Sequence, residues 1–165
     1  EPRPMVWAGL GGFARRFVHR GNENASVLVD DDAHLPSEVE STIDAARSGN
    51  WNQIFAVFQP HRYSRTESIG ATFSNSFVKA DRVVITDVFA GGESPRHGVS
   101  GLIVFDAIKE KFPDRDLHYL PNRDELIDFL ATELSEGDLC LTMGAGDITS
   151  LPEEFGLVQN TPRAL

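Results

Sequence analysis

The sequence predicts an α/β fold: a three-layer, Rossmann-like domain with a mostly parallel sheet of about five or six strands and helices on both faces. Two observations predict it. From Ser26 onward, short apolar runs alternate with segments of helical periodicity. The apolar runs also lack the alternation of polar and apolar residues that marks a half-exposed strand, so both faces of the sheet are expected to be covered.

The strands are predicted where the apolar runs lie, at residues 26–30, 54–58, 83–87, 117–120 and 139–143. Residues 5–21 leave two interpretations open, an extra edge hairpin or a short helix. The glycines there (Gly9, Gly11 and Gly12) do not form a GxGxxG turn between a strand and a helix, so a dinucleotide fingerprint is not predicted.

Helices are predicted between the strands from apolar residues at helical spacing. These residues are Val39, Ile43 and Ala46; Ile69, Phe73 and Phe77; Val104, Ile108 and Phe112; and Leu126, Phe129, Leu130 and Leu134. Pro36 suits the first position of the first helix. Ser64 and Glu67 predict a capping box for the second, and Asn122 predicts a cap for the last.

Composition excludes several classes of function. With 165 residues the chain fits one domain, and its net charge of −10 argues against a general nucleic-acid binder. Cys140 is the single cysteine and lies in an apolar run, so a buried thiol and a reducing, cytoplasmic setting are expected. No signal peptide or membrane-length apolar span is found, and the chain begins with Glu1, which suggests a piece of a longer protein.

The most informative segment is basic. His61, Arg62 and Arg65 follow an apolar strand in a chain that is otherwise acidic. In open α/β sheets, ligands bind at the carboxyl ends of the strands, so this cluster predicts a site for an anion. The alternative is a pair of solvated arginines on a surface loop.

Other strand ends carry reactive groups as well. The three consecutive aspartates Asp30, Asp31 and Asp32 repel one another, which favours a cation, a hydroxyl donor or a helix N-terminus beside them. Asp31 could hold a ribose hydroxyl pair or Mg²⁺ through water. The alternative is that one aspartate caps the helix at Pro36 and the others are solvated. His34, in the same loop, makes a second histidine at this edge beside His61.

The glycines after two strands allow two interpretations. Gly144 and Gly146, like Gly91 and Gly92, could form a backbone nest for an anion or could simply be needed for turns. The chain contains no GxxxxGK[ST] loop, so any ATP phosphates must be bound by another domain.

Five ordered motifs resemble the C-terminal domain of the Mur ligases. The family's FQPHRYxR run is matched in full by residues 58–65. Its other runs, GxxRRF, DDYxHHPTE, DVYxAGE and GAGxI, resemble residues 12–17, 30–38, 87–93 and 144–148. The chain departs from the family pattern at Asp32, where an aromatic residue is usual, and at Leu35, where a second histidine is usual.

The resemblance implies that residues 1–165 are one domain of a longer, three-domain bacterial enzyme, with residues 1–22 as a leading segment. The implied activity is ATP-dependent acid–amino-acid ligation in peptidoglycan synthesis. The carboxylate of UDP-N-acetylmuramate becomes an acyl phosphate, and the amine of L-alanine attacks it. ATP and Mg²⁺ would be bound mainly by the central domain, which carries the P-loop, and no metal ligands are expected here. The isolated domain is therefore expected to be inactive.

The resemblance also assigns roles to individual residues. Asp31 would contact the ribose of ATP. His34, His61, Arg62 and Arg65 would line the amino-acid pocket, with the arginines on its carboxylate. Gly144 and Gly146 would lie near the same amino acid.

Three other functions remain open from the sequence. Within the family, the alternative is the ligase that recycles murein tripeptide onto UDP-N-acetylmuramate. From another enzyme class, Asp30 and Asp32 could be a phosphatase-type aspartate pair with Mg²⁺, although the expected downstream lysine is not found. The third is a small-ligand binding or regulatory module without catalysis.

Overall fold

The computed structural model describes residues 18–23 and 26–159. The strands are β1 (Val18–Glu23), β2 (Ser26–Asp31), β3 (Ile54–Phe58), β4 (Arg82–Ile85), β5 (Leu117–Tyr119) and β6 (Leu139–Met143). The α-helices are α1 (Pro36–Arg47), α2 (Tyr63–Ile69), α3 (Leu102–Lys111), α4 (Arg123–Glu133) and α5 (Leu151–Gln159). Two 3₁₀ helices, η1 (Gly70–Asn75) and η2 (Asp147–Ser150), complete the described part.

The strands form a six-stranded sheet in the order β1-β2-β6-β3-β4-β5, in which only β1 runs antiparallel to its neighbour. The predicted mostly parallel sheet is confirmed. Asp31 and Phe58 both pair with Met143, and Phe58 also pairs with Ile85, so β2, β6, β3 and β4 end at the same level. We call the loops that follow these four strands the carboxyl edge of the sheet.

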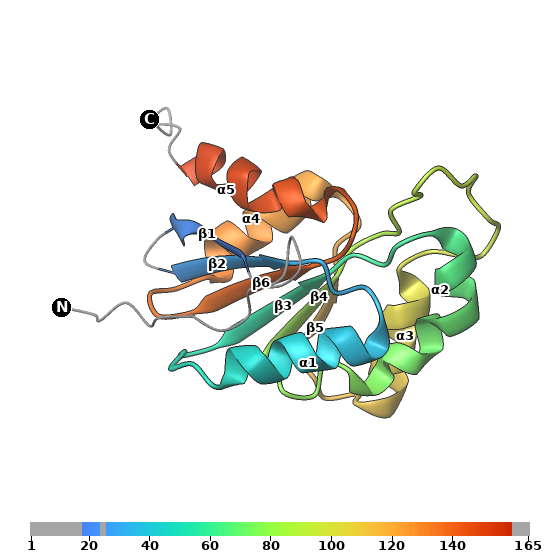
Figure 1. The fold of residues 1–165 in the computed structure, drawn as a ribbon, viewed down its shortest axis with the longest axis horizontal. Helices are drawn as coiled ribbons and strands as arrows, with labels where there is room; N and C mark the ends of the chain where they lie inside the picture. Colours follow the sequence, from blue (N-terminus) through green and yellow to red (C-terminus); the bar gives the residue numbers. More distant parts are fainter. Residues whose placement is uncertain (1–17, 24–25, 160–165) are drawn as a thin grey trace.

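Helices cover both faces of the sheet, as Figure 1 shows. On one face, α1, η1 and α3 bury residues such as Ile43, Phe73 and Ile108 against the strands. On the other face, α4 and α5 bury Leu130 and Phe155. β3 and β6 lie in the middle and are buried along their whole length, which is why their sequences read as continuous apolar runs.

The second predicted helix differs from the observed one. The apolar spacing predicts a single helix through Phe77, but α2 ends at Ile69 and continues as the 3₁₀ helix η1. The predicted capping box is wrong, because Ser64 donates both its N–H and its hydroxyl to the carboxylate of Glu93, which lies in another loop. Glu67 pairs with Arg96 in that loop. A contact distant in sequence has therefore replaced the local cap.

The ends of the chain were less accessible to sequence reasoning. The edge-hairpin interpretation fits residues 18–23, which form β1; the remainder of the 5–21 segment lies outside the described residues. Helix α5 was not predicted.

Asn122 caps α4 as predicted, since its Oδ1 accepts from the N–H groups of Asp124 (2.9 Å) and Glu125 (3.1 Å). Asp87, predicted to lie in a strand, follows β4 and accepts from Val88 N–H and Gly101 N–H instead.

The buried thiol is confirmed. Cys140 is fully buried in β6, and burial raises the pKa of its thiol to about 12. A thiol with this pKa is an inert part of the core at neutral pH.

None of the helices in the described ranges has both the length and the apolar composition that crossing a membrane requires.

Candidate functional site

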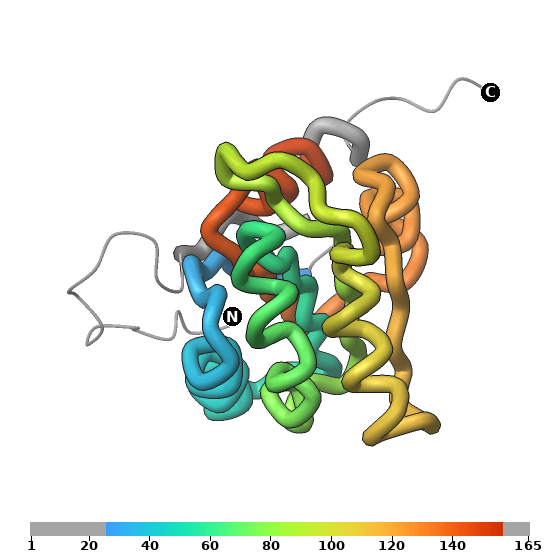
Figure 2. Tube along the Cα trace, turned by 90° about the vertical axis from the view of Figure 1, so that its right-hand side faces the viewer, coloured from blue at the N-terminus to red at the C-terminus, as the bar shows by residue number. Residues whose placement is uncertain are grey.

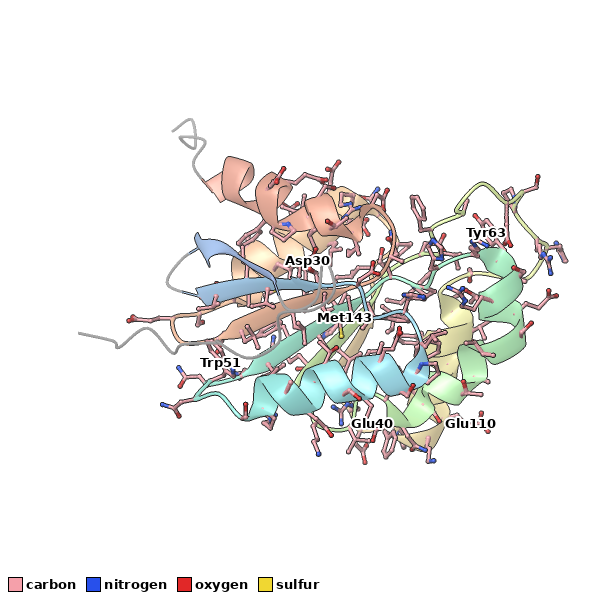
Figure 3. All side chains as sticks on the ribbon, viewed as in Figure 1. Asp30, Glu40, Trp51, Tyr63, Glu110 and Met143 are labelled. Carbon is pink, nitrogen blue, oxygen red and sulfur yellow. The ribbon has the colours of Figure 1, made fainter. Side chains whose placement is uncertain are left out.

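The predicted site residues gather at the carboxyl edge, which Figure 2 views from outside. The loop after β3 and the loop after β4 run next to each other there, joined by a parallel bridge between His61 and Phe89. In Figure 3, Tyr63 marks the start of α2 at this edge, and Trp51 lies toward the opposite edge. The sequence prediction that the groups share one edge is therefore confirmed.

Arg62 sits in an unusual backbone conformation. Its φ is +69°, and within the described ranges it is the one non-glycine residue with positive φ. Its N–H donates to Phe89 O (2.8 Å), and its carbonyl accepts from Thr66 N–H (3.1 Å) and Thr66 Oγ1 (2.9 Å). A non-glycine residue in this region carries strain of about 1–3 kcal/mol. The surrounding hydrogen bonds hold it there and leave the guanidinium exposed.

His61 lies at the centre of the basic segment. Its ring stacks on Phe89 at 5.7 Å between centroids with a 16° interplanar angle, and the ring of His34 lies 6.0 Å away. Nη1 of Arg65 is 3.2 Å from His61 Nδ1. A guanidinium can only donate, so Nδ1 accepts and a neutral imidazole carries its proton on Nε2.

The charge state of His61 agrees with that geometry. The pKa of His61 is lowered by burial first, then by the positive charges of Arg65 and Arg62 and by His34, while Asp32 acts in the opposite direction. Lowering the pKa of a histidine disfavours its charged form. At neutral pH His61 is an uncharged ring that supports one arginine and stands close to the other.

The two arginines have no carboxylate partner among the side chains that the structure describes. Throughout residues 26–156, for which side chains are described, no Asp or Glu lies within ion-pair distance of Arg62 or Arg65. Positive charges that are held close together without a counter-charge favour binding of an anion, and guanidinia suit a carboxylate or phosphate bidentately. This is the chemistry that the carboxyl edge offers.

The three aspartates have different surroundings, and Asp30 and Asp31, as neighbours in β2, point to opposite faces of the sheet. Asp30 is 1% exposed, and its Oδ1 accepts from Thr142 Oγ1 (3.0 Å). Asp31 is 4% exposed, and its Oδ1 accepts from Ala33 N–H (2.8 Å) and Thr42 Oγ1 (3.2 Å). Asp32 is only half-buried. The ribose contact of Asp31 stays a prediction; in the structure this carboxylate orders the loop.

The suggestion that an aspartate caps α1 is wrong. The N-cap residue is Leu35, and Glu38 of the first turn reaches back to it: its Oε2 accepts from the N–H groups of His34 and Leu35, both at 3.1 Å. His34 is held further by its Nδ1, which donates to Asp32 O (2.7 Å). Glu38 thus fixes the loop that presents His34 to His61.

Packing accounts for the glycines after β6. A Cβ on Gly144 would lie 2.9 Å from Ile148 Cγ2, and one on Gly146 would lie 2.4 Å from Phe89 Cγ and 2.7 Å from Gln59 Oε1. The turn interpretation is therefore sufficient for both, and their contact with an amino acid stays a prediction.

Gln59 is the residue at this edge whose role sequence reasoning missed. It is 6% exposed; its Nε2 donates to Asp147 Oδ1 (2.7 Å), and its Oε1 accepts from Ile148 N–H (3.1 Å). It ties the end of β3 to the glycine turn. The sequence did contain a signal for this role: Gln59 is polar and directly follows β3, whose side chains are all apolar.

No three His, Cys, Asp or Glu side chains lie together as metal ligands within the described part of the chain.

The comparisons with known proteins agree with the fold. A family described as "Mur ligase, glutamate ligase domain" matches residues 15–146. The UDP-N-acetylmuramate–L-alanine ligase of Pelotomaculum thermopropionicum is 45% identical over 139 residues, which cover 84% of this chain and 30% of the relative. The chain thus spans less than a third of that protein's length.

Solved structures share the fold. UDP-N-acetylmuramate-alanine ligase from Thermotoga maritima matches with a TM-score of 0.69 and 26% identity, covering 89% of this chain and 30% of that one. A murein peptide ligase from Psychrobacter arcticus matches with a TM-score of 0.74 and 20% identity, covering 94% and 32%. With the family match over most of its length, the chain belongs to the Mur ligases, as a member of their glutamate ligase domain family.

Proposed function

We propose that this domain positions the incoming amino acid, and closes over ATP, in a longer protein that acts as a UDP-N-acetylmuramate–L-alanine ligase. The observation that carries the proposal is the pair of arginines, Arg62 and Arg65, which stand at the carboxyl edge without a carboxylate partner among the described residues. The relatives that match over most of this chain bear that ligase name.

In this proposal the arginines bind the carboxylate of L-alanine. Arg65 is oriented by His61, and Arg62 by the backbone hydrogen bonds that fix its positive φ. A carboxylate held by two guanidinia leaves the amine of the amino acid pointing away from them, toward the activated carboxyl of UDP-N-acetylmuramate. The guanidinia also offset the negative charge of three groups that meet there: the amino-acid carboxylate, the acyl phosphate and the phosphates derived from ATP.

The imidazole rings of His34 and His61 have a different role from the arginines in this proposal. His34 and His61 form one wall of the pocket, and neutral His61 adds no further positive charge to it. Nδ1 of His34 donates to Asp32 O, so in the neutral ring Nε2 is an acceptor. That nitrogen is suited to receive a hydrogen bond from the ammonium or amine of the bound amino acid.

ATP and Mg²⁺ belong to the proposal for the longer protein. The chain has no P-loop and, within its described residues, no metal-ligand cluster, so the phosphates and the metal would be held by the central domain. ATP supplies the phosphoryl group that activates the acid. From this domain we propose Asp31 for the ribose, through the loop that it orders.

Phosphate release by the full-length protein tests the proposal. The reaction contains ATP, Mg²⁺ and UDP-N-acetylmuramate, with L-alanine, glycine, L-serine or murein tripeptide as the acceptor. We expect strong stimulation by L-alanine. Stimulation only by the tripeptide would assign the chain to the recycling ligases, and no stimulation by any acceptor would contradict ligase function.

The phosphatase-type alternative has less support. Asp30 is 1% exposed and accepts a hydrogen bond from Thr142, so it is poorly placed to attack a phosphate ester. A purely ligand-binding role leaves the same arginines in use but predicts no turnover, which the phosphate-release assay distinguishes.

A further inference from the structure

The loop between β4 and α3 runs along the basic segment and touches it at several points. Phe89 accepts a hydrogen bond from Arg62 N–H, donates its own N–H to Pro60 O (2.9 Å) and stacks on His61. Gly91, with φ +58°, passes so close that a Cβ there would lie 3.0 Å from Arg62 Cγ. Through these contacts the loop lies against Pro60, His61 and Arg62.

Glu93 makes the strongest of these contacts. Its carboxylate accepts from Ser64 N–H (2.9 Å) and from the hydroxyl of the same residue. Ser64 lies between Arg62 and Arg65, in the first turn of α2. The first N–H groups of a helix have no partner within the helix, and Arg62, at the N-cap position, makes no side-chain cap. Glu93 therefore caps α2 from a different loop.

The electrostatics favour the same arrangement. The pKa of Glu93 is lowered, first by the hydrogen bonds from the Ser64 side chain and backbone, and also by Arg96 and Arg62. The carboxylate is thus ionised at neutral pH, and it forms no ion pair with the arginines of the site. Its attraction to Arg62 acts from beyond ion-pair distance, so both guanidinia remain available to a ligand.

We infer that Glu93 is a positioning residue for amino-acid binding: by holding Ser64 it sets the backbone from which Arg62 and Arg65 present their guanidinia. This inference rests on the proposed function, since it assigns those arginines to the acceptor carboxylate. It predicts that loss of Glu93 weakens use of the amino acid while leaving the nucleotide substrates unaffected.

The chain offers a matched control. Arg96, in the same loop, pairs with Glu67 of α2, and both side chains are about half exposed, at 48% and 53%. Arg96→Ala also removes a contact between this loop and α2, but it does not touch the backbone between the arginines. A general loosening of the loop would affect both variants equally, whereas positioning through Ser64 would affect only Glu93.

The test is steady-state kinetics of the full-length protein with Glu93→Ala, Glu93→Gln, Ser64→Ala and Arg96→Ala. For Glu93→Ala we expect the KM for L-alanine to rise about tenfold, as for loss of one charge-assisted hydrogen bond. The KM values for ATP and UDP-N-acetylmuramate should stay the same. Glu93→Gln, which keeps one acceptor oxygen for Ser64 N–H, and Ser64→Ala should show intermediate rises, and Arg96→Ala none.

Hydrogen exchange of the same variants separates this inference from the proposed function. Glu93→Ala should speed amide exchange in residues 62–66, and Arg96→Ala should not. An unchanged KM for L-alanine in Glu93→Ala, or equal effects of Glu93→Ala and Arg96→Ala, would overturn the inference. If the unmodified protein uses no amino acid, the proposed function fails, and the exchange measurement alone decides whether Glu93 orders the arginine segment.

Discussion

The cations at the amino edge of the sheet and the two arginines of the candidate site are held differently. At the amino edge, where the strands begin, three cations are paired with carboxylates: Arg47 with Asp81 (2.9 Å), Lys79 with Asp44 (2.9 Å), and Arg82 with Asp116 and Glu133. At the carboxyl edge, Arg62 and Arg65 are held by backbone and imidazole contacts and have no carboxylate partner among the described residues. Three cations of the amino edge are thus neutralised by the domain's own carboxylates, whereas the charges of Arg62 and Arg65 stay available to an anion.

The difference teaches how to separate structural from functional charge in this domain. At the amino edge, Asp81 also accepts from Ile54 N–H (2.7 Å), so its carboxylate serves both the start of a strand and an arginine. Acidic residues occur at the carboxyl edge too, but Glu38 and Glu93 accept from backbone N–H groups and not from the site arginines. We therefore expect substitutions of the site arginines to change the KM for L-alanine, and substitutions at the amino edge to change the free energy of unfolding.

The largest effect is expected from the site arginines. In the full-length protein, Arg65→Ala removes a charge-assisted contact to the amino-acid carboxylate, so the KM for L-alanine should rise by about 10- to 100-fold. Steady-state kinetics with varied L-alanine measures it. Lys79→Ala, which removes a cation at the amino edge, serves as the control and should leave this KM unaltered. An unaltered KM in Arg65→Ala would remove Arg65 from the pocket.

The next effect is on stability at the amino edge. Asp81→Ala leaves Ile54 N–H without its acceptor and Arg47 without its counter-charge, so the free energy of unfolding should fall by about 1–3 kcal/mol. Denaturant unfolding measures the loss, and the KM for L-alanine should be unaffected. A shift in KM as large as that of Arg65→Ala would show that the two edges are not independent.

A smaller effect should come from the cap of α4, which begins after β5 but contains none of the predicted site residues. Asn122→Ala removes the acceptor for two N–H groups, and loss of such a cap costs about 1 kcal/mol. Thermal unfolding should report this loss without any change in amino-acid use. An effect on KM would extend the binding edge beyond the four strand ends described above.

The smallest effect concerns the protonation of His61. Its pKa lies below the ordinary value of 6.5, so the folded state takes up this proton only at lower pH than the unfolded state does. The stability contributed by neutral His61 is full above the ordinary pKa and is lost as the pH falls toward the folded pKa. In Arg65→Gln the neighbouring charge is gone, so the pKa of His61 should move upward.

An NMR titration of the His61 ring protons measures both pKa values. A His61 pKa that is the same in both proteins would show that burial alone, and not the arginine, keeps the ring neutral.

Much of the fold could be predicted because its signals are local. The buried strands β3 and β6 have apolar residues throughout, and the helical stripes of α1, α3 and α4 repeat within single segments. The length of α2 could not be predicted, because its apolar spacing continues through η1, where Gly70 packs against Ile103 of α3 (a Cβ would come within 2.7 Å). Tertiary packing overrode the local period there.

The candidate site follows the same division. The sequence by itself determined which reactive residues follow which strand, and the parallel arrangement then places them at one edge, since parallel strands end together. Only the tertiary structure decided what each polar side chain binds. Ser64 donates a hydrogen bond to Glu93, 29 residues away, and the predicted pairing with Glu67 does not form. Gln59 donates to Asp147, 88 residues away. The physical reason is that apolar periodicity is read along the chain, whereas a hydrogen-bond partner is chosen by distance in space between loops that only the folded sheet brings together.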